Sequence, residues 1–236
     1  MNLRSSESAL SIAFATGTAP GKWFTRFTER TGHREPLTEE SPDPLGRLID
    51  GRADIALVRL PDLRIDDTFH LVKLYEEQPG VAVPKDSELT LTEALGDDDL
   101  AGHSIFYSPG EDGVVDIVAL NEGIDVVATG VGVAIGPRPL LRRLGSRRTE
   151  NRDYLGGDPT TVALVWRMRD DCDEIQDFVG IARGRTGGSS RTVQPKRSAA
   201  EKAAVKKARR EGIGGTRRQP GVREGSGGPK RQRRRR

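Results

Sequence analysis

A bend near the start of the chain carries groups that suit the binding of a small anion. Thr16, Gly17 and Thr18 follow an apolar segment that predicts a strand and precede a segment that predicts a helix. Such a bend presents backbone N–H groups and the positive end of the helix dipole, and the threonines add hydroxyl donors. Gly17 lets a ligand approach the backbone. The pattern predicts a carboxylate site, with capping of the helix by Thr16 and Thr18 as the alternative.

The other reactive residue types are scattered, and no group of them has the spacing of an active site. Acidic runs at 97–99 and 170–173 fall in expected turns beside helices, where carboxylates more often stabilise a helix N-terminus than hold a metal ion. Cys172 is the only cysteine and has no histidine nearby in the sequence, while His33, His70 and His103 have no metal-ligand spacing. We therefore expect a protein that is not an enzyme, with no catalytic residue, no metal and no cofactor.

The charge of the chain divides near residue 184. Residues 1–184 carry 20 Lys and Arg against 32 Asp and Glu, whereas residues 185–236 carry 18 against 3. All aromatic residues lie at or before Phe178, so the last part lacks the apolar side chains that offset chain entropy. We expect a folded acidic body and a disordered basic tail. The sequence shows no membrane-spanning segment and no secretory signal, which predicts a cytoplasmic, soluble protein with no membrane contact.

The basic tail has the composition of a segment that neutralises phosphates. It lacks aromatic residues for stacking on bases, so we expect contact with a nucleic-acid backbone or an acidic partner rather than base readout. The alternative is a solubilising tail that folds back on the acidic body. The candidate nucleic-acid contacts are Lys206, Lys207, Arg209, Arg210, Arg233, Arg234, Arg235 and Arg236.

The order of apolar segments in the first sixty residues is typical of an α/β fold. It indicates strand, helix, strand, helix and strand in succession. The segment 53–58 is almost continuously apolar, as expected of a strand buried on both faces of a parallel sheet. Farther along we expect strands at 69–75, 80–83, 103–107, 114–120, 131–135 and 160–168, and helices at 91–95, 122–129, 140–144 and 175–181.

Four stretches, taken in order, resemble one known family. They are a strand with a Thr/Gly turn (10–18), a helix, turn and strand (45–59), a helix, glycines and strand ending in proline (127–138), and a closing strand and helix that begin at 162. With this order and spacing, residues 10 to about 184 resemble the effector-binding (substrate-binding) domain of LysR-type transcriptional regulators.

The resemblance implies a two-lobed, type 2 periplasmic-binding-protein-like α/β fold over residues 1–184, followed by the tail at 185–236. It implies a first lobe of about residues 10–60 and 137–184 and a second lobe of about 61–136, with chain crossings near Val58–Pro61 and Gly136–Arg138. Only nine residues precede the first strand, so the family's winged helix-turn-helix is expected to be absent. The short stretch between Tyr107 and Val127 indicates a trimmed second lobe.

The two-lobed arrangement extends the candidate ligand site beyond the bend. Hydroxyl groups from both lobes would donate to the ligand, and an arginine at the hinge would pair with an acidic group. Two of these residues have structural alternatives: Ser41 precedes Pro42 and could begin a helix, and Arg59 could belong to a structural ion pair. The candidate ligand-binding residues are Thr16, Gly17, Thr18, Ser41, Arg59, Ser108 and Thr129.

These features together predict a stand-alone LysR-type effector-binding domain. We expect it to bind a small anionic metabolite, a carboxylate, in the interlobe cleft and to take part in transcriptional regulation. The basic tail would tether it to nucleic acid or to an acidic partner. The alternative is a nucleic-acid-associated interaction platform whose α/β body no longer binds a ligand. The sequence leaves open whether the chain forms a homodimer.

Overall fold

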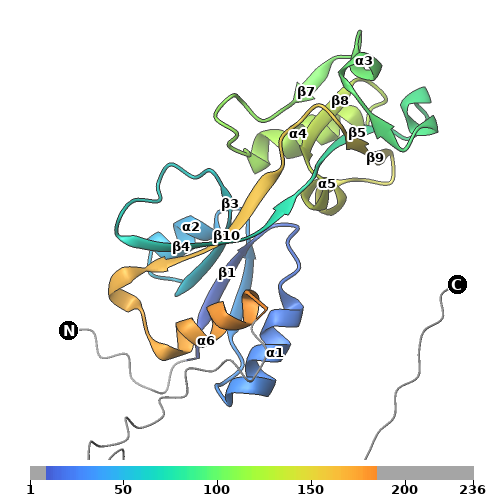
Figure 1. The fold of residues 1–236 in the computed structure, drawn as a ribbon. Helices are drawn as coiled ribbons and strands as arrows, with labels where there is room; N and C mark the ends of the chain where they lie inside the picture. Colours follow the sequence, from blue (N-terminus) through green and yellow to red (C-terminus); the bar gives the residue numbers. More distant parts are fainter. Residues whose placement is uncertain (1–8, 185–236) are drawn as a thin grey trace, which may run out of the picture. The chain divides into compact units, whose positions relative to one another are not determined.

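The computed structural model describes residues 9–184, which form two α/β lobes within one compact unit (Figure 1). The first lobe is built on a mixed sheet with the strand order β2-β1-β3-β10-β4, in which β1 lies parallel to β2 and β3 and β10 runs antiparallel to β3 and β4. Its elements are β1 (Ser11–Ala15), α1 (Gly21–Thr31), β2 (Leu37–Ser41), α2 (Pro44–Ile49), β3 (Ile55–Leu60), β4 (Phe69–Glu77), β10 (Thr160–Arg167), η2 (Met168–Asp170) and α6 (Asp173–Ala182).

The central strand β3 explains why helices cover both faces of this sheet. Ile55 and Leu57 pack with α1 and α6 on one face, and Ala56 and Val58 pack with α2 on the other. All four side chains are buried, as the continuous apolar run predicts. The first lobe therefore has a core on each side of its sheet.

The second lobe repeats this arrangement on a sheet with the order β6-β9-β5-β8-β7. Leu120 and Ile124 of α4 and Leu140 of α5 pack on one face of this sheet, and Leu89 and Leu100 pack on the other. Its elements are β5 (Pro79–Pro84), η1 (Glu88–Leu91), β6 (Ala94–Leu95), α3 (Asp97–Leu100), β7 (Ile105–Tyr107), α4 (Ile117–Val127), β8 (Val133–Pro137), α5 (Arg138–Leu144) and β9 (Thr149–Tyr154).

The described chain crosses between the lobes at two adjacent places. One crossing is Gln78, between β4 and β5, and the other is the segment 155–159, between β9 and β10. Glu77 pairs with Thr160 on one side of the crossings, which places the two connections next to each other. The first lobe thus comprises residues 9–77 and 160–184, and the second comprises 79–154.

The predicted crossings near Val58–Pro61 and Gly136–Arg138 are therefore wrong, and so are the lobe limits drawn from them. After Pro61 the chain turns back and adds β4 to the edge of the first sheet, beside β10. After Pro137 the chain remains in the second lobe, because Leu140 and Leu141 of α5 pack on its sheet. Both errors have the same cause: the element that follows each turn packs on the sheet of the same lobe instead of entering the other lobe.

Three smaller predictions also differ from the structure. The strand expected at 114–120 is the start of α4, because the carboxylate of Asp116 accepts hydrogen bonds from the amides of Val118 and Ala119 and caps a helix there. The helix expected at 91–95 is replaced by η1 and the short strand β6. The polar strand β9 was not predicted; its place between β5 and β6 leaves every residue half-buried.

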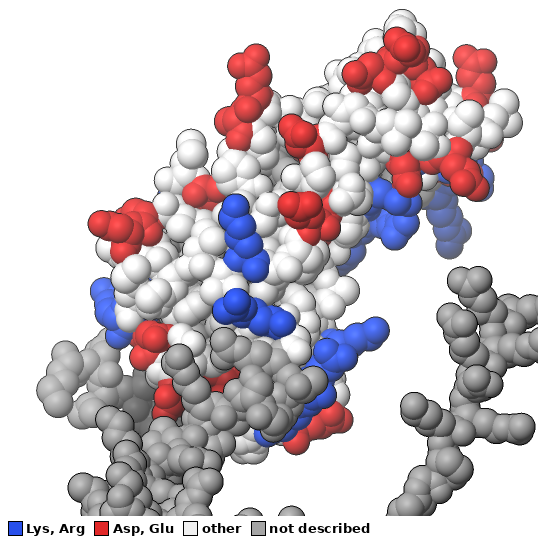
Figure 2. Space-filling view, viewed as in Figure 1, with Lys and Arg blue, Asp and Glu red and all other residues white. Residues whose placement is uncertain are grey.

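Charged side chains on the described surface are unevenly distributed. Figure 2 shows acidic side chains gathered over α3, at the end of the second lobe, and basic side chains over α1 and α5. The predicted tail and its nucleic-acid contacts lie outside the described residues, so the charge division between body and tail remains a property of the sequence.

Candidate functional site

Two neighbouring hollows lie between the lobes. The larger has a volume of about 780 Å³ and the smaller about 350 Å³, and both are lined by Pro61 and Asp62 of the loop that follows β3. The larger volume lies within the range of cavities that hold metabolite-sized ligands. The larger hollow is therefore the candidate ligand site.

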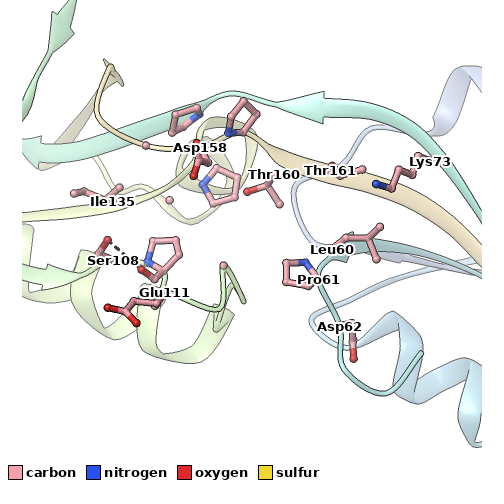
Figure 3. A pocket seen from close by; sticks show the side chains of 18 of the residues that line it. Leu60, Pro61, Asp62, Lys73, Ser108, Glu111, Ile135, Asp158, Thr160 and Thr161 are labelled. Atoms are coloured by element: carbon pink, nitrogen blue, oxygen red, sulfur yellow. Dashed lines mark hydrogen bonds between the residues drawn. The ribbon is translucent and has the colours of Figure 1, made fainter. Parts of the chain in front are cut away.

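The larger hollow combines apolar walls with a few polar groups. Figure 3 shows Lys73 and Thr161 of the first lobe across the hollow from Ser108 and Glu111 of the second. Asp158, in the second crossing, lies near Thr160 in the same view. Leu60, Ile135 and several prolines and glycines complete the lining. Such a lining can bury an apolar body and orient it through a small number of hydrogen bonds.

The charges around the larger hollow are mixed rather than basic. Lys73 is the one cationic side chain among the described residues that line it, and the acidic ones are Asp62, Glu111 and Asp158. Asp62 already pairs with Arg64, with 2.7 Å between a guanidinium nitrogen and a carboxylate oxygen. A carboxylate ligand in this hollow would therefore have Lys73 as its positive partner.

Arg64 closes one side of the smaller hollow. Its guanidinium donates hydrogen bonds to both Asp43 and Asp62, at distances of 2.7–3.0 Å. The hydrogen bond from Arg64 holds the pKa of Asp43 below its usual value. No local pattern marks Arg64, because its partners Asp43 and Asp62 come together only when α2 and the loop after β3 are placed side by side.

Arg59 has a structural role instead of the predicted ligand-binding role. Its Nε donates to a carboxylate oxygen of Glu77 at 2.7 Å, and another nitrogen donates to the second oxygen at 3.2 Å. The remaining guanidinium nitrogen donates to the backbone oxygen of Thr16 at 2.8 Å. Only 6% of the Arg59 side chain and 1% of the Glu77 side chain are exposed. The ion-pair alternative is therefore confirmed, and Glu77 places this pair directly beside the first crossing.

The bend at residues 16–18 does not present free donors in the way that the sequence predicts. The amide of Gly17 donates to the carboxylate of Glu40 at 3.1 Å, and the hydroxyl of Thr18, which is buried, donates to the backbone oxygen of Ala15 at 2.7 Å. The helix α1 begins only at Gly21, after Pro20, and no side chain caps it. The predicted helix cap is wrong, and the Gly17 amide and the Thr18 hydroxyl are already paired within the chain. The Thr16 amide donates to the backbone oxygen of Ser41 at 3.2 Å, and contact of the Thr16 hydroxyl with a ligand stays a prediction.

Glu40 and Arg143 are functional candidates that sequence analysis missed. The guanidinium of Arg143, in α5 of the second lobe, donates to both oxygens of the Glu40 carboxylate, at 3.1 and 3.3 Å. This interaction, followed by the hydrogen bond from the Gly17 amide, lowers the pKa of Glu40. The two partners lie 103 residues apart. No local pattern could have connected them.

The three remaining candidates lie in different places. The hydroxyl of Ser41 is buried and accepts a hydrogen bond from the amide of Asp43, the residue that caps α2. Thr129 was wrongly placed in the cleft: its hydroxyl donates to the backbone oxygen of Val126 at the end of α4, and it lines a separate hollow near Lys85. Ser108 lines the larger hollow, and its contact with a ligand stays a prediction.

Two further observations concern metal ions and membranes, within the part of the chain that the structure describes. No group of three or more His, Cys, Asp or Glu side chains within residues 9–184 is arranged to hold a metal ion. None of the helices found there has both the length and the apolar character needed to span a bilayer. In the acidic run at 97–99, the carboxylate of Asp99 accepts a hydrogen bond from the amide of Gly96 at the start of α3, the helix-terminal role that was expected.

Two α/β lobes, two adjacent crossings and a hollow between the lobes define the type 2 periplasmic-binding-protein-like class of fold. Residues 7–121 match the family model of the LysR substrate binding domain, in agreement with the resemblance seen in the sequence. This match ends within α4. The two resembling stretches after it, at 127–138 and from 162, therefore rest on the fold.

Solved structures support the same fold over most of the described chain. The effector-binding domain of BenM with its effector benzoate has a TM-score of 0.58 and 16% identity, covering 75% of this chain and 91% of that one. The reduced form of OxyR from N. meningitidis has a TM-score of 0.56 and 17% identity, covering 75% and 95%. Corynebacterium glutamicum OxyR, as an H2O2-bound mutant, has a TM-score of 0.55 and 17% identity, covering 77% and 68%. Identities this low establish the fold alone. No curated protein sequence matches the chain.

Proposed function

We propose that the body of this protein binds a small-molecule effector in the larger hollow and takes part in transcriptional regulation in the cytoplasm. The observation that carries the proposal is the hollow of about 780 Å³ beside both crossings, lined by residues of both lobes. A molecule held there contacts both lobes at once, so its binding favours one interlobe arrangement over others. The BenM domain that shares this fold has benzoate as its effector, which supports a ligand of similar size here.

The polar groups of the hollow indicate how an effector would be recognised. Thr160, Thr161 and Ser108 offer hydroxyls from both lobes, and Lys73 and Asp158 offer one charge of each sign. The carboxylate expected from the sequence would bind with its negative group toward Lys73. A cationic effector would instead turn its positive group toward Asp158. Comparison of Lys73→Gln with Asp158→Asn assigns the sign of the effector's charge.

Ligand binding in the larger hollow is expected to disappear in Ser108→Phe. Ser108 is exposed on the wall of the hollow, so a phenylalanine ring there occupies ligand space without entering the core. The measurement is thermal denaturation of the full chain against a library of carboxylates, amines and neutral metabolites. A ligand at about 100 times its Kd stabilises the wild type by roughly 2.7 kcal/mol. We expect the same ligand to leave the Tm of Ser108→Phe unchanged.

The control for this variant is Ser104→Phe, which places the same ring on an exposed residue outside the hollow. It should respond to the ligand as the wild type does. An equal response of wild type and Ser108→Phe would show that the ligand binds elsewhere. If no compound stabilises the wild type while the full chain still retains nucleic acid, the interaction-platform function replaces the effector-binding one.

We also propose that residues 185–236 bind a polyanion, and the support for this is their charge of 18 Lys and Arg against 3 Asp and Glu. Deletion of residues 186–236 should abolish salt-sensitive retention of DNA and leave the unfolding transition of the body nearly unchanged. The plot of log affinity against log salt concentration has a negative slope, and each phosphate that the protein no longer neutralises makes this slope shallower by about 0.9. DNA binding of equal strength and salt dependence in the truncated protein would rule out this role for the tail.

A further inference from the structure

The carboxylate of Glu40 lies where an incoming anion was expected. It accepts the amide hydrogen of Gly17 at 3.1 Å, and the guanidinium of Arg143 contacts both of its oxygens, at 3.1 and 3.3 Å. A backbone amide and an arginine are the donors that a protein uses to bind a free carboxylate. The bend and α5 thus form an anion-binding cradle, and a side chain of the same protein fills it.

This contact joins the two lobes. Glu40 lies at the end of β2 and Gly17 follows β1, both in the first lobe, whereas Arg143 belongs to α5 of the second. The backbones also approach closely, since a Cβ atom added to Gly17 would lie 3.0 Å from the backbone oxygen of Pro139 and 3.1 Å from the Cα of Leu140. The Glu40 carboxylate therefore joins the two lobes beside the close approach of Gly17 to α5.

We propose that Glu40 is a built-in anionic ligand that keeps free anions out of this interlobe contact. A carboxylate tethered next to its cradle has an effective concentration in the millimolar range or above, so a free carboxylate at micromolar concentration does not displace it. The bend consequently excludes anionic effectors, and the interlobe contact there forms without one. This proposal is independent of the larger hollow and holds whether or not an effector binds in that hollow.

Removal of the Glu40 side chain should convert the cradle into a site for a free carboxylate. In Glu40→Ala, the Gly17 amide and the Arg143 guanidinium lose their shared partner, and acetate carries the same functional group that was removed. The experiment is thermal denaturation of the full chain in sodium acetate and in sodium chloride at matched ionic strength. We expect acetate to raise the Tm of Glu40→Ala by about 2–4 °C over chloride, and to leave the wild type unchanged.

The neighbouring Glu39 supplies a matched control. It also pairs with an arginine, Arg47, at 2.8 Å, but both partners belong to the first lobe. Glu39→Ala should show no acetate-specific rise in Tm. Glu40→Gln should show none either, because the amide side chain fills the cradle while lacking the charge. The double variant Glu40→Ala/Arg143→Met should lose the rescue because half of the cradle is gone.

An equal response of wild type and Glu40→Ala to acetate would overturn the proposal, and so would a rescue that persists without Arg143. These outcomes are separate from a failure of the effector hypothesis. That failure would show as a missing library response in the wild type and would leave the acetate rescue of Glu40→Ala intact.

Discussion

Replacement of Arg59 by methionine should lower the free energy of unfolding by about 3–5 kcal/mol, the range found when one partner of a buried ion pair is removed. The carboxylate of Glu77, 1% exposed, would remain in the interior without its positive partner. The backbone oxygen of Thr16 would lose its hydrogen bond from the guanidinium as well. Urea denaturation of the wild type and of Arg59→Met, followed by circular dichroism, measures the difference.

Two controls distinguish the effect of leaving a buried charge unpaired from the effect of removing an arginine as such. Arg59→Met/Glu77→Leu removes both charges and should be more stable than Arg59→Met alone, since no uncompensated charge stays buried. Arg64→Met breaks the ion pairs of a half-exposed arginine with Asp43 and Asp62, and should cost about 1 kcal/mol or less. Similar losses of unfolding free energy for Arg59→Met and Arg64→Met would show that burial of the Arg59–Glu77 pair does not increase its effect on stability.

Replacement of Gly17 by valine is the second change with a large expected effect, roughly 2–5 kcal/mol of stability. Gly17 has a φ of +83°, a left-handed conformation that costs about 1–2 kcal/mol for a residue with a Cβ atom. The new Cβ would also meet the backbone of Pro139 at 3.0 Å, and overpacking of this kind adds about 1–3 kcal/mol. The measurement is again the free energy of unfolding in urea.

The matched control is Gly32→Val, at the end of α1. Gly32 has a φ of +72°, but a Cβ there would have no atom within 4 Å. Gly32→Val therefore reports the conformational cost alone, and its difference from Gly17→Val measures the tightness of the interlobe approach. Equal losses of unfolding free energy in the two variants would mean that the close approach of the lobes at Gly17 adds nothing to the cost of the substitution.

The first lobe could be predicted well because its signals are local. The continuous apolar run of β3 and the amphipathic spacing of Trp23, Phe24 and Phe27 in α1 each determine an element and its buried side within a few residues. The second lobe was harder. Its strand β9 has the polar sequence Thr149–Tyr154 and is a strand only because β5 and β6 lie on either side of it.

The candidate site was predicted in part, and its errors are of one kind. Residue types and strand ends identified the bend, Arg59 and Ser108 as groups near a cleft, and all three lie at or near the interlobe region. The sequence could not reveal that Glu40, Glu77 and Arg143 would satisfy these donors and charges, since those partners come from other elements. Which groups remain free for a ligand is decided by tertiary pairing.

The two crossings between the lobes differ in length. One crossing is the single residue Gln78, whose backbone oxygen accepts a hydrogen bond from the amide of Arg138 at 3.0 Å. The other is the segment 155–159, which contains two adjacent glycines. Gly156, Gly157 and Asp158 of the longer crossing also line the larger hollow. A molecule held in that hollow would contact the longer crossing directly, so its binding would be coupled to the angle between the lobes.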